Sequence, residues 1–253
     1  MQYASFHSLN GKTAYVTGGA GGIGEAVSRG LARNGVNVGI LDIDGTLAQA
    51  LAAELRQSGV SSIGLQCDLR DIGALKSGID SLRQSLGPAG ILVNNAAHDQ
   101  RHTWREMTAD YWDERMAVNL RHMFFAIQAV APDMLAAKSG SIINFSSTSW
   151  KLKMGMLPAY TTAKAAVHGL TKSFQMEFGK SNIRVNTVYP GWVMTKRQKE
   201  LWFDEAGQKV LDEHQAMAGL IQPEDVANMV LFLSADDSRF CTGAEFTCDG
   251  GWL

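Results

Sequence analysis

The chain has 253 residues, of which 45% are hydrophobic, and 23 Lys and Arg stand against 25 Asp and Glu for a formal net charge of −2. A length near 250 residues is enough to bury one large core without disulfides, so we expect a single domain spanning residues 1–253. The near-neutral charge provides no basic field for a polyanion, and nucleic acid is therefore excluded as the expected partner.

The cysteines and the apolar segments indicate a protein of the cytoplasm. Three scattered cysteines without a Cys-x-x-Cys pair are too few for a disulfide framework and fit a reducing compartment. Residues 1–10 lack the basic flank and apolar stretch of a signal peptide. The most apolar long segment, residues 123–134, is well short of the roughly 20 residues needed to cross a bilayer. We therefore predict a cytoplasmic protein with no membrane partner. The cysteines are Cys67, Cys241 and Cys248.

Short β-prone runs alternate with longer segments of helical periodicity along the whole chain. The predicted strands are Thr13–Thr17, Val36–Leu41, Ile63–Cys67, Ile91–Val93, Ser141–Phe145, Ile183–Tyr189 and Glu245–Cys248. Helices are predicted within Gly22–Asn34, Asp44–Gln57, Tyr111–Ala137 and Tyr160–Gly179. Such alternation is typical of right-handed βαβ crossovers, which build a parallel sheet covered on both faces. We therefore predict the α/β class, as a Rossmann-type doubly wound parallel sheet whose ligands bind beyond the carboxyl ends of the strands.

A glycine-rich loop follows the first predicted strand and leads into the first predicted helix. From Thr17 the chain reads Thr-Gly-Gly-Ala-Gly-Gly-Ile-Gly. Glycines let a backbone approach a pyrophosphate closely, and the helix start offers unpaired N–H groups, so the loop predicts a dinucleotide site rather than a mere flexible turn. Two registers remain open: Gly19, Gly21 and Gly24 fit G-x-G-x-x-G, whereas Gly18, Gly22 and Gly24 fit T-G-x-x-x-G-x-G.

Asp42 ends the second predicted strand and favours NAD as the cofactor. A carboxylate at this position accepts hydrogen bonds from both adenine-ribose hydroxyls and repels a 2′-phosphate. The glycine loop contains no Arg or Lys that would favour NADP. The alternative is that Asp42 only caps the following helix, a role for which Asp44 is an equally good candidate.

Several motifs, in the same order along the chain, resemble those of the short-chain dehydrogenase/reductase family. The glycine loop has the form T-G-x-x-x-G-I-G, and Asn94-Asn95-Ala96-Ala97 resembles N-N-A-G with alanine in place of the last glycine. The other matching motifs are Cys67-Asp68-Leu69, Asn119, Ser146-Ser147, Tyr160-Thr161-Thr162-Ala163-Lys164, Pro190-Gly191 and Asp249-Gly250-Gly251. The resemblance covers nearly the whole chain.

The resemblance implies an NAD site along the carboxyl ends of the strands. The family places an acid against the adenine after the third strand, where this chain has Asp68. Ala97 adds a methyl group close to the expected cofactor. The implied cofactor contacts are Gly18, Gly21, Gly22, Ile23, Asp42, Ile43, Asp68, Leu69, Asn95, Ala96, Tyr160, Lys164, Pro190, Gly191, Val193 and Thr195.

Four residues are the predicted catalytic groups. Tyr160 and Lys164 are spaced to share one face of a helix, where an ammonium and a positive nicotinamide ring would favour the phenolate. The alternative is an ordinary exposed Tyr and Lys pair. Ser147, at the separation from Tyr160 that the family shows, is expected to hold the substrate oxygen, with Ser149 as the competing candidate. In the family, the position of Asn119 bends its helix and holds a water that links Lys164 to solvent.

Segments that follow the strands without a family pattern are expected to bind the substrate. They are His98 to His102, Trp150 to Leu157, and Trp192 to Gln222, and residues 192–222 are the predicted substrate loop or lid. Their hydrogen-bonding groups and tryptophan faces suit a polyhydroxylated ring better than a long acyl chain. The predicted substrate contacts are Asp99, Ser147, Trp150, Tyr160, Trp192 and Arg197.

Stretches such as Tyr111–Arg115 and Thr195–Gln198 resemble the aldose-oxidising branch of the family. This resemblance implies NAD-dependent oxidation of a sugar at its anomeric C1, giving an aldonolactone. One alternative is a carbonyl or 3-oxoacyl reductase, which would ordinarily use NADPH; Asp42 counts against it. The other is a non-catalytic NAD-binding regulator, which need not retain Ser147, Tyr160 and Lys164 together.

Two further expectations concern metals and assembly. His98 and His102 have i,i+4 spacing, but they follow a strand in a predicted loop and have no evident third ligand, so we predict no metal site. Family members pair long helices between subunits, and the resemblance therefore implies a homo-tetramer or a dimer.

Overall fold

The computed structural model describes residues 3–253, in which seven parallel strands form one sheet with the order β3-β2-β1-β4-β5-β6-β7. The strands are β1 Thr13–Thr17, β2 Asn37–Asp42, β3 Ser62–Gln66, β4 Ile91–Asn94, β5 Gly140–Phe145, β6 Ile183–Pro190 and β7 Glu245–Cys248. The strand order reverses direction at β1 and β4, which is the place where a doubly wound sheet opens a crevice for a ligand. The predicted Rossmann-type α/β fold is confirmed.

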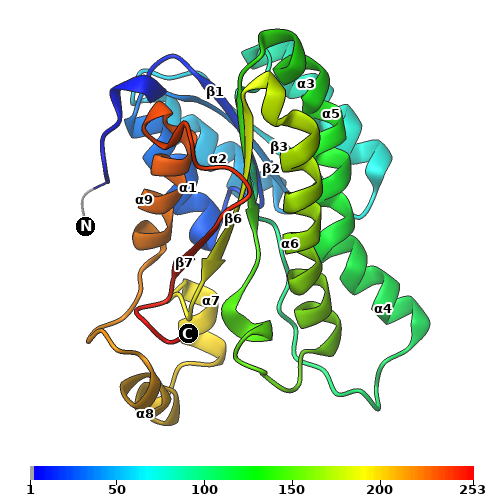
Figure 1. Cartoon of the computed structure of the whole chain (residues 1–253), viewed down its shortest axis with the longest axis vertical. Coiled ribbons are helices and arrows are strands. Elements are labelled where there is room, and N and C mark those ends of the chain that lie inside the picture. The colour runs from blue at the N-terminus through cyan, green and yellow to red at the C-terminus, as the bar shows by residue number, and fades with distance from the viewer. Residues whose placement is uncertain (1–2) are drawn as a thin grey trace.

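Helices cover both faces of the sheet (Figure 1). The longer helices are α1 Gly22–Arg33, α2 Gly45–Arg56, α3 Ile72–Leu86, α5 His122–Ala137, α6 Pro158–Phe178 and α9 Pro223–Ser234. One face carries α1, α2 and α9, and the other carries α3, α5 and α6. The short helices α4 Ala109–Met116, α7 Lys196–Leu201 and α8 Glu205–His214 lie at the end towards which the β6 and β7 arrows point.

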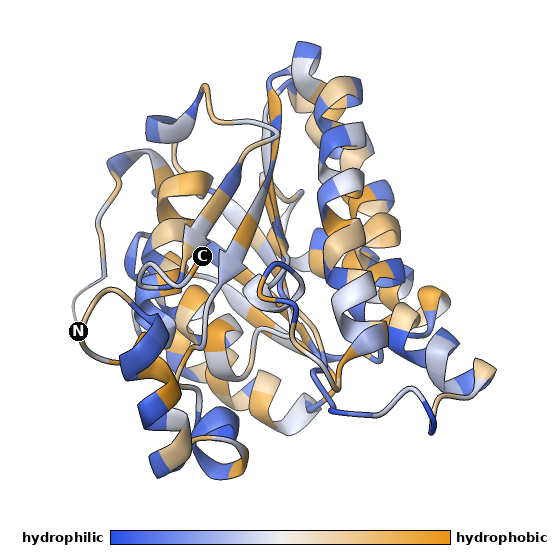
Figure 2. Cartoon of the chain, turned by 60° about the horizontal axis from the view of Figure 1, so that its bottom comes forward, coloured by the Kyte–Doolittle hydropathy of each residue, from blue (hydrophilic) through white to orange (hydrophobic). Residues whose placement is uncertain are grey.

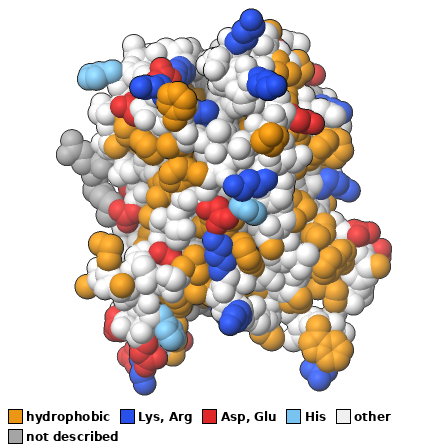
Figure 3. Space-filling view, viewed as in Figure 1, with side chains coloured by type: hydrophobic (Ala, Val, Ile, Leu, Met, Phe, Trp, Pro, Cys, Tyr) orange, Lys and Arg blue, Asp and Glu red, His pale blue; other side chains and the backbone are white. Residues whose placement is uncertain are grey.

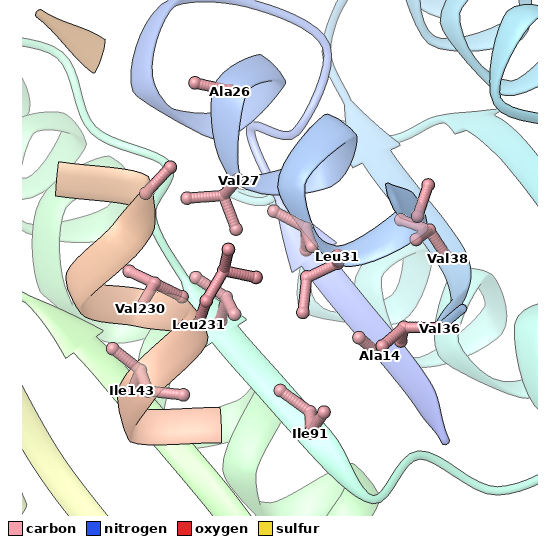
Figure 4. Packing of buried hydrophobic residues seen from close by; sticks show 14 of the residues in the cluster. Ala14, Ala26, Val27, Leu31, Val36, Val38, Ile91, Ile143, Val230 and Leu231 are labelled. Atoms are coloured by element: carbon pink, nitrogen blue, oxygen red, sulfur yellow. The ribbon is translucent and has the colours of Figure 1, made fainter. Parts of the chain in front are cut away.

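Two apolar clusters, one on each face, hold the layers together. Along β1, Ala14 and Val16 enter the cluster under α1 and α9, whereas Tyr15 enters the cluster under α3 and α5. All five β1 residues are buried, because a parallel strand with helices on both sides has no solvent face. Figure 4 shows Leu31 of α1 and Leu231 of α9 packing over the strands, and Figure 2 shows apolar residues along the strands and polar residues on outer turns of the helices.

The predicted continuous helix Tyr111–Ala137 is wrong in one respect. The structure divides it into α4, a π-helix at Ala117–Arg121, and α5. The Asn119 side chain donates a hydrogen bond to the carbonyl of Arg115 at 2.9 Å and so competes for an acceptor of the helix ladder. A side chain inserted in this way is a known cause of helix distortion. The distortion turns the Asn119 side chain towards the loop that follows β4.

Charged side chains of both signs lie on the surface of the molecule (Figure 3). Lys, Arg, Asp and Glu are interspersed over the face seen in Figure 3. Within residues 3–253, no helix is both long and apolar enough to cross a membrane.

Candidate active site

The glycine loop lies between the carboxyl end of β1 and the start of α1, and its geometry selects one of the two registers. Gly18 and Gly22 have φ values of +60° and +55°, which side chains other than glycine's rarely tolerate. A Cβ at Gly24 would lie 1.9 Å from the carbonyl oxygen of Gly18. The register with Gly18, Gly22 and Gly24 is therefore the one that the backbone requires.

The start of α1 fits the pyrophosphate of a dinucleotide. Gly21 is its N-cap, and within the described chain no side chain caps the first N–H groups. A Cβ at Gly21 would meet no heavy atom of residues 3–253 within 4 Å, so the space beside the helix start is open. Unpaired N–H groups and the positive end of the helix dipole stabilise an anion in such a space.

The turn after β4 packs directly on this loop. Asn95 donates from Nδ2 to the carbonyls of Gly18 at 2.9 Å and Thr17 at 3.2 Å. The Thr17 hydroxyl accepts from the N–H groups of Asn95 and Ala96. His122, fully buried, holds the carbonyl of Ala96 at 3.2 Å, and burial lowers the pKa of this histidine to about 3, which keeps it neutral. Ala97 is exposed.

Asp42 ends β2 beside the glycine loop. One of its carboxylate oxygens accepts from the N–H of Ala20 at 2.9 Å, and the other accepts from the N–H of Asp44 at 3.1 Å. Asp44, not Asp42, caps α2, through the N–H of Leu47. Asp42 is therefore held next to the glycine loop and does not cap α2. Ile43, the next residue, is largely exposed.

Asp68 and Leu69 follow β3, at the expected adenine end of the site. Leu69 is buried, whereas Asp68 is partly exposed and bound by Arg70 through Nη2 at 2.7 Å. This hydrogen bond lowers the pKa of Asp68. Arg70 in turn binds Glu114 of α4 at 2.9 Å. The carboxylate that was predicted to face the adenine thus belongs to a chain of ion pairs that continues into α4.

Tyr160 and Lys164 both lie near the start of α6, and the end of β5 fixes their helix. The Lys164 Nζ donates to the carbonyl of Phe145 at 2.8 Å, and the carbonyl of Lys164 accepts from the Ser146 hydroxyl at 2.7 Å. Nζ lies 5.7 Å from the centroid of the Tyr160 ring. Lys164 is 1% exposed, and this burial lowers its pKa to about 7, although the nearby carboxylate of Asp99 acts in the opposite direction.

The protein alone does not produce the lowered tyrosine pKa that the sequence predicts. Burial is the largest cause acting on Tyr160 and raises its pKa, and the charge of Asp99 raises it further. The Ser147 side chain acts in the opposite direction. Tyr160 is therefore a protonated phenol in this state, and an additional positive charge is needed to favour the phenolate.

Ser147 and Ser149 occupy different environments. Ser147 is partly exposed and close enough to Tyr160 to affect its pKa. Its hydroxyl accepts from the N–H of Ser149 at 3.2 Å and caps a short 3₁₀ turn, Thr148–Trp150. The Ser149 hydroxyl is buried and has no hydrogen-bond partner among residues 3–253. This geometry supports Ser147 as the group that faces the substrate.

The segment after β6 passes over the glycine loop. A Cβ at Gly191 would lie 2.7 Å from Cα of Asp249, so glycine is needed where the chain crosses the end of β7. The carbonyl of Pro190 accepts from the Thr148 hydroxyl at 3.2 Å, and Val193 is buried. The methyl group of Thr195 lies 3.2 Å from the Cβ position of Gly22. Residues predicted from distant motifs are therefore brought together at one edge of the sheet.

Asp99 and Arg197, two of the predicted substrate contacts, form an ion pair with each other. Asp99 accepts from Gln198 Nε2 at 2.7 Å and from Arg197 Nε at 3.3 Å. Gln198 also accepts from the indole N–H of Trp192 at 2.9 Å. In addition, the guanidinium of Arg101 lies over the ring of Trp202 at 4.1 Å. These contacts join the loop after β4 to the start of the 192–222 segment.

Trp150 and Trp192 are engaged elsewhere. Trp150 donates to the Ser146 hydroxyl and lies 6.2 Å from the Tyr189 ring, so its contacts are with β5 and β6. Trp192 packs on Phe203 and on Trp252 near the carboxyl terminus, with ring centroids 5.7 Å and 6.5 Å away. Trp192 is linked to Asp99 only through Gln198 in the described chain, and both tryptophans pack against other aromatic rings.

Three residues that were not among the predicted catalytic, cofactor or substrate contacts support this site. Arg115 is buried and contacts His98, and Gln198 links Asp99 to Trp192. His102 donates from Nδ1 to the carbonyl of Gln100 and accepts the N–H of Ala159, the residue before Tyr160. An arginine is seldom buried, and the sequence alone does not show that Arg115 is buried. Among the described residues, no group of three His, Cys, Asp or Glu side chains forms a metal site.

Known proteins resemble this chain over its whole length. A family model described as "Enoyl-(Acyl carrier protein) reductase" matches residues 18–253. D-xylose 1-dehydrogenase of Caulobacter vibrioides is 44% identical over 100% of both chains, and a probable galactose dehydrogenase of Rhizobium meliloti is 40% identical over 98% of this chain and 97% of its own. A solved structure of 7α-hydroxysteroid dehydrogenase with NADH and 7-oxo glycochenodeoxycholic acid has a TM-score of 0.93 at 30% identity, covering 99% of this chain and 98% of that one.

Proposed function

This chain belongs to the short-chain dehydrogenase/reductase family, and we propose that it is an NAD-dependent aldose dehydrogenase that oxidises the anomeric C1 of a pentose or hexose to an aldonolactone. As a member of the family it is an oxidoreductase that acts on CH–OH groups of a small molecule with a nicotinamide cofactor. The relatives named for D-xylose and galactose support a sugar as the substrate.

The proposed reaction assigns a role to each member of the catalytic group. The Ser147 hydroxyl holds the C1 oxygen. Tyr160 first loses its own proton to solvent and then, as the phenolate, accepts the C1 hydroxyl proton. Lys164 is fixed by the carbonyl of Phe145 and stabilises the phenolate as it forms. The nicotinamide ring, when bound, supplies the acceptor for the hydride from C1 and a positive charge next to the phenol. Asn119 holds the loop that carries Asp99, through the backbone of His98.

The choice of NAD rests on Asp42. Its carboxylate lies against the glycine loop through the N–H of Ala20, where it would accept from ribose hydroxyls and repel a 2′-phosphate. We assign the remaining cofactor contacts to the residues predicted from the sequence. The open start of α1 receives the pyrophosphate, and Thr195 covers it from the other side.

The observation that carries the choice of a sugar is the carboxylate of Asp99 in the loop after β4. Its charge acts on both Tyr160 and Lys164 and raises the pKa of each. Gln198 and Arg197 orient it, and an ionised carboxylate retains lone pairs for further donors. Sugar hydroxyls are such donors, whereas the thioester end of an acyl chain offers none to it. We propose residues 192–222 as the lid that closes over the sugar.

An initial-rate assay tests this function. Purified protein is incubated with NAD or NADP and a panel of pentoses and hexoses, and in parallel with NADH or NADPH and a 3-oxoacyl thioester or an oxo-steroid. We expect NADH formation with at least one aldose and a preference for NAD over NADP. Turnover of the acyl thioester or the steroid, with no aldose oxidised, would reject the proposal in favour of a carbonyl reductase.

We propose in addition that the protein is a cytoplasmic homo-tetramer. Its cysteines are free thiols in the described chain, which suits a reducing compartment. Phe124 of α5 and Met176 of α6 are exposed apolar side chains that a neighbouring subunit would cover. Light scattering on the purified protein measures the assembly; a monomer would contradict this part of the proposal.

A further inference from the structure

One side of α4 and the adjoining π-helix faces the loop that follows β4. Tyr111, Arg115 and Asn119 lie along this side, and each contacts the loop. Tyr111 packs edge-on against His102 with ring centroids 5.2 Å apart. Asn119 accepts from the N–H of His98 at 2.9 Å and donates to its carbonyl at 3.2 Å. Arg115 lies between these two contacts, over the ring of Tyr111 at 5.0 Å.

Arg115 is only 7% exposed, which is uncommon for an arginine and requires partners for its charge. It has two polar partners: an ion pair with Glu114 and a hydrogen bond from Nη1 to Nδ1 of His98. A guanidinium has donors and no acceptor, so Nδ1 of His98 must present its lone pair. His98 is therefore neutral with its proton on Nε2.

His98 is held at its backbone N–H, at its carbonyl and at its ring, and the next residue is Asp99. Burial lowers the pKa of His98, and the charges of Arg115 and Arg197 lower it further, whereas Asp99 and Glu114 raise it. A neutral imidazole at working pH preserves its contact with Arg115. The position of Asp99 is thus set from two sides: by α7 at its carboxylate and by Arg115 through the preceding residue.

The contacts of Arg115 continue outwards to the other end of the site. Glu114 binds Arg70 at 2.9 Å, and Arg70 binds Asp68 at 2.7 Å. Arg121 of the π-helix also donates to the carbonyl of Arg70 at 2.8 Å. The chain of charged side chains therefore runs from Asp68, two residues after β3, to Arg115 of α4, which contacts the residue before Asp99.

We propose that Arg115 is a positioning residue that orients Asp99 towards the substrate and links this loop to the adenine end of the cofactor site. The proposal rests on the proposed function, in which Asp99 binds sugar hydroxyls and Asp68 lies beside the adenine. Arg115 itself touches neither substrate nor cofactor, and it acts through His98 in one direction and through Glu114 and Arg70 in the other.

Steady-state kinetics on Arg115→Met and Arg115→Lys test the proposal. Lysine keeps the charge but cannot hold Glu114 and His98 at once as a planar guanidinium does. We expect the KM for the sugar to rise about tenfold in both variants with kcat within about threefold of wild type. Arg29→Met, which removes an ion-paired arginine from α1, is the matched control and should leave both constants unchanged. An unchanged sugar KM in folded Arg115→Lys would overturn the proposal.

A double variant separates positioning from general stability. If Arg115 acts through Asp99, Arg115→Lys adds nothing to the sugar KM of Asp99→Asn, whereas independent effects would multiply. For the link to the adenine end, Arg70→Met should raise the KM for both NAD and the sugar by about threefold. If Arg70→Met changes only the KM for NAD, Arg70 does not link the adenine end to the loop that carries Asp99.

An NMR measurement keeps this proposal distinct from the proposed function. In the wild-type protein at neutral pH, the His98 ring should show one neutral tautomer with the proton on Nε2, and Arg115→Lys should show a mixture. If no aldose is oxidised but the tautomer responds, the sugar assignment fails and the positioning of His98 by Arg115 stands. If the wild-type ring already shows a mixture, the positioning role is wrong whatever the substrate.

Discussion

The cofactor side and the substrate side of the site are built in different ways. The glycine loop, Asn95 and Asp42 are held mainly by contacts to backbone groups at the ends of adjacent strands. The loop after β4 and the 192–222 segment are joined by contacts between side chains, such as Asp99 with Gln198 and Arg101 with Trp202. The geometry of backbone contacts at strand ends is fixed by the sheet, whereas a contact between side chains changes when either residue is substituted. The first region is therefore expected to be rigid, and the second to set specificity.

The catalytic residues belong to the rigid side. A buried row of polar side chains joins β4, β5 and β6 to α6: Asn94 donates to Asn144, Asn144 donates to Thr171, and Thr187 donates to Thr171. Thr171 lies on α6, two turns after Lys164. Buried polar groups that are paired in this way specify one packing arrangement. Tyr160 and Lys164 are thus fixed by the sheet, and their positions do not depend on the 192–222 segment.

Replacing the proposed base is expected to have the largest effect. Tyr160→Phe should lower kcat by about 10²–10⁴-fold, because general acid–base catalysis contributes on that order. NADH binding, measured by fluorescence, should remain close to wild type since the rigid cofactor side is intact. Tyr189→Phe, which changes a buried tyrosine of β6, is the control and should retain activity. Substantial turnover in Tyr160→Phe would contradict the assignment.

The burial of Lys164 should make the free energy of unfolding depend on pH. Burial lowers its pKa from an ordinary value of 10.5 to about 7, so between these values the unfolded chain binds a proton that the folded protein has released. The free energy of unfolding of wild type, relative to Lys164→Met, should therefore rise with pH in this window by at most about 1.4 kcal/mol per pH unit. Urea denaturation from pH 6 to 10 measures the difference. Exposed Lys172 of the same helix, changed to Met, should show no such slope.

Asp42 tests how far the cofactor side depends on charge. Asp42→Asn keeps an oxygen for the N–H of Ala20 but loses the charge that repels a 2′-phosphate. We expect kcat/KM with NAD to fall about tenfold to a hundredfold, since a hydrogen bond to a charged group contributes about 1.5–3 kcal/mol, and the use of NADP to increase. Asp44→Ala, which removes only the α2 cap, should cost stability and leave the cofactor preference unchanged. The same NAD preference in Asp42→Asn would reject the role of this charge.

His102 gives the smallest expected effect and tests the junction between the two sides. Its Nε2 accepts the buried N–H of Ala159 at 3.3 Å, at the start of α6. His102→Leu should lower the free energy of unfolding by about 1–2 kcal/mol, because a buried donor is left unpaired. His102→Gln should recover part of this loss, and His7→Leu, at an exposed histidine, should have no effect. Equal stability of His102→Leu and wild type would show that this bond does not support the helix.

The same division explains what the sequence alone could predict. The doubly wound parallel sheet follows from the alternation of strand and helix patterns, and the glycine loop and Asp42 are recognised from residue types directly after the strands. The two registers of the loop could not be separated, because only the φ angles of Gly18 and Gly22 distinguish them. The resemblance implied a bend at Asn119, but the bounds of the π-helix at Ala117–Arg121 could not be predicted, since they arise from the contacts of one asparagine side chain.

The contacts within the substrate side could not be predicted from the sequence for a physical reason. Gln198 and Asp99 are far apart in sequence and meet only when α7 folds over the loop after β4. Trp150 and Trp192 have the flat apolar side chains expected of surfaces that stack on a sugar. In the structure Trp150 contacts Tyr189, and Trp192 packs on Phe203 within the 192–222 segment. The sequence shows which residues the loops contain, but which of them lie beside the substrate depends on how the loops pack in the fold.

Isotope transfer from C1 is the most direct test of the central claim that this site oxidises the anomeric carbon. An aldose that is a substrate is prepared with deuterium at C1 alone, and the NADH formed is analysed by NMR and mass spectrometry. The account predicts deuterium at C4 of the nicotinamide and an aldonolactone as the sugar product. Unlabelled NADH, with the C1 deuterium retained in the product, would contradict it, because oxidation would then take place at another carbon.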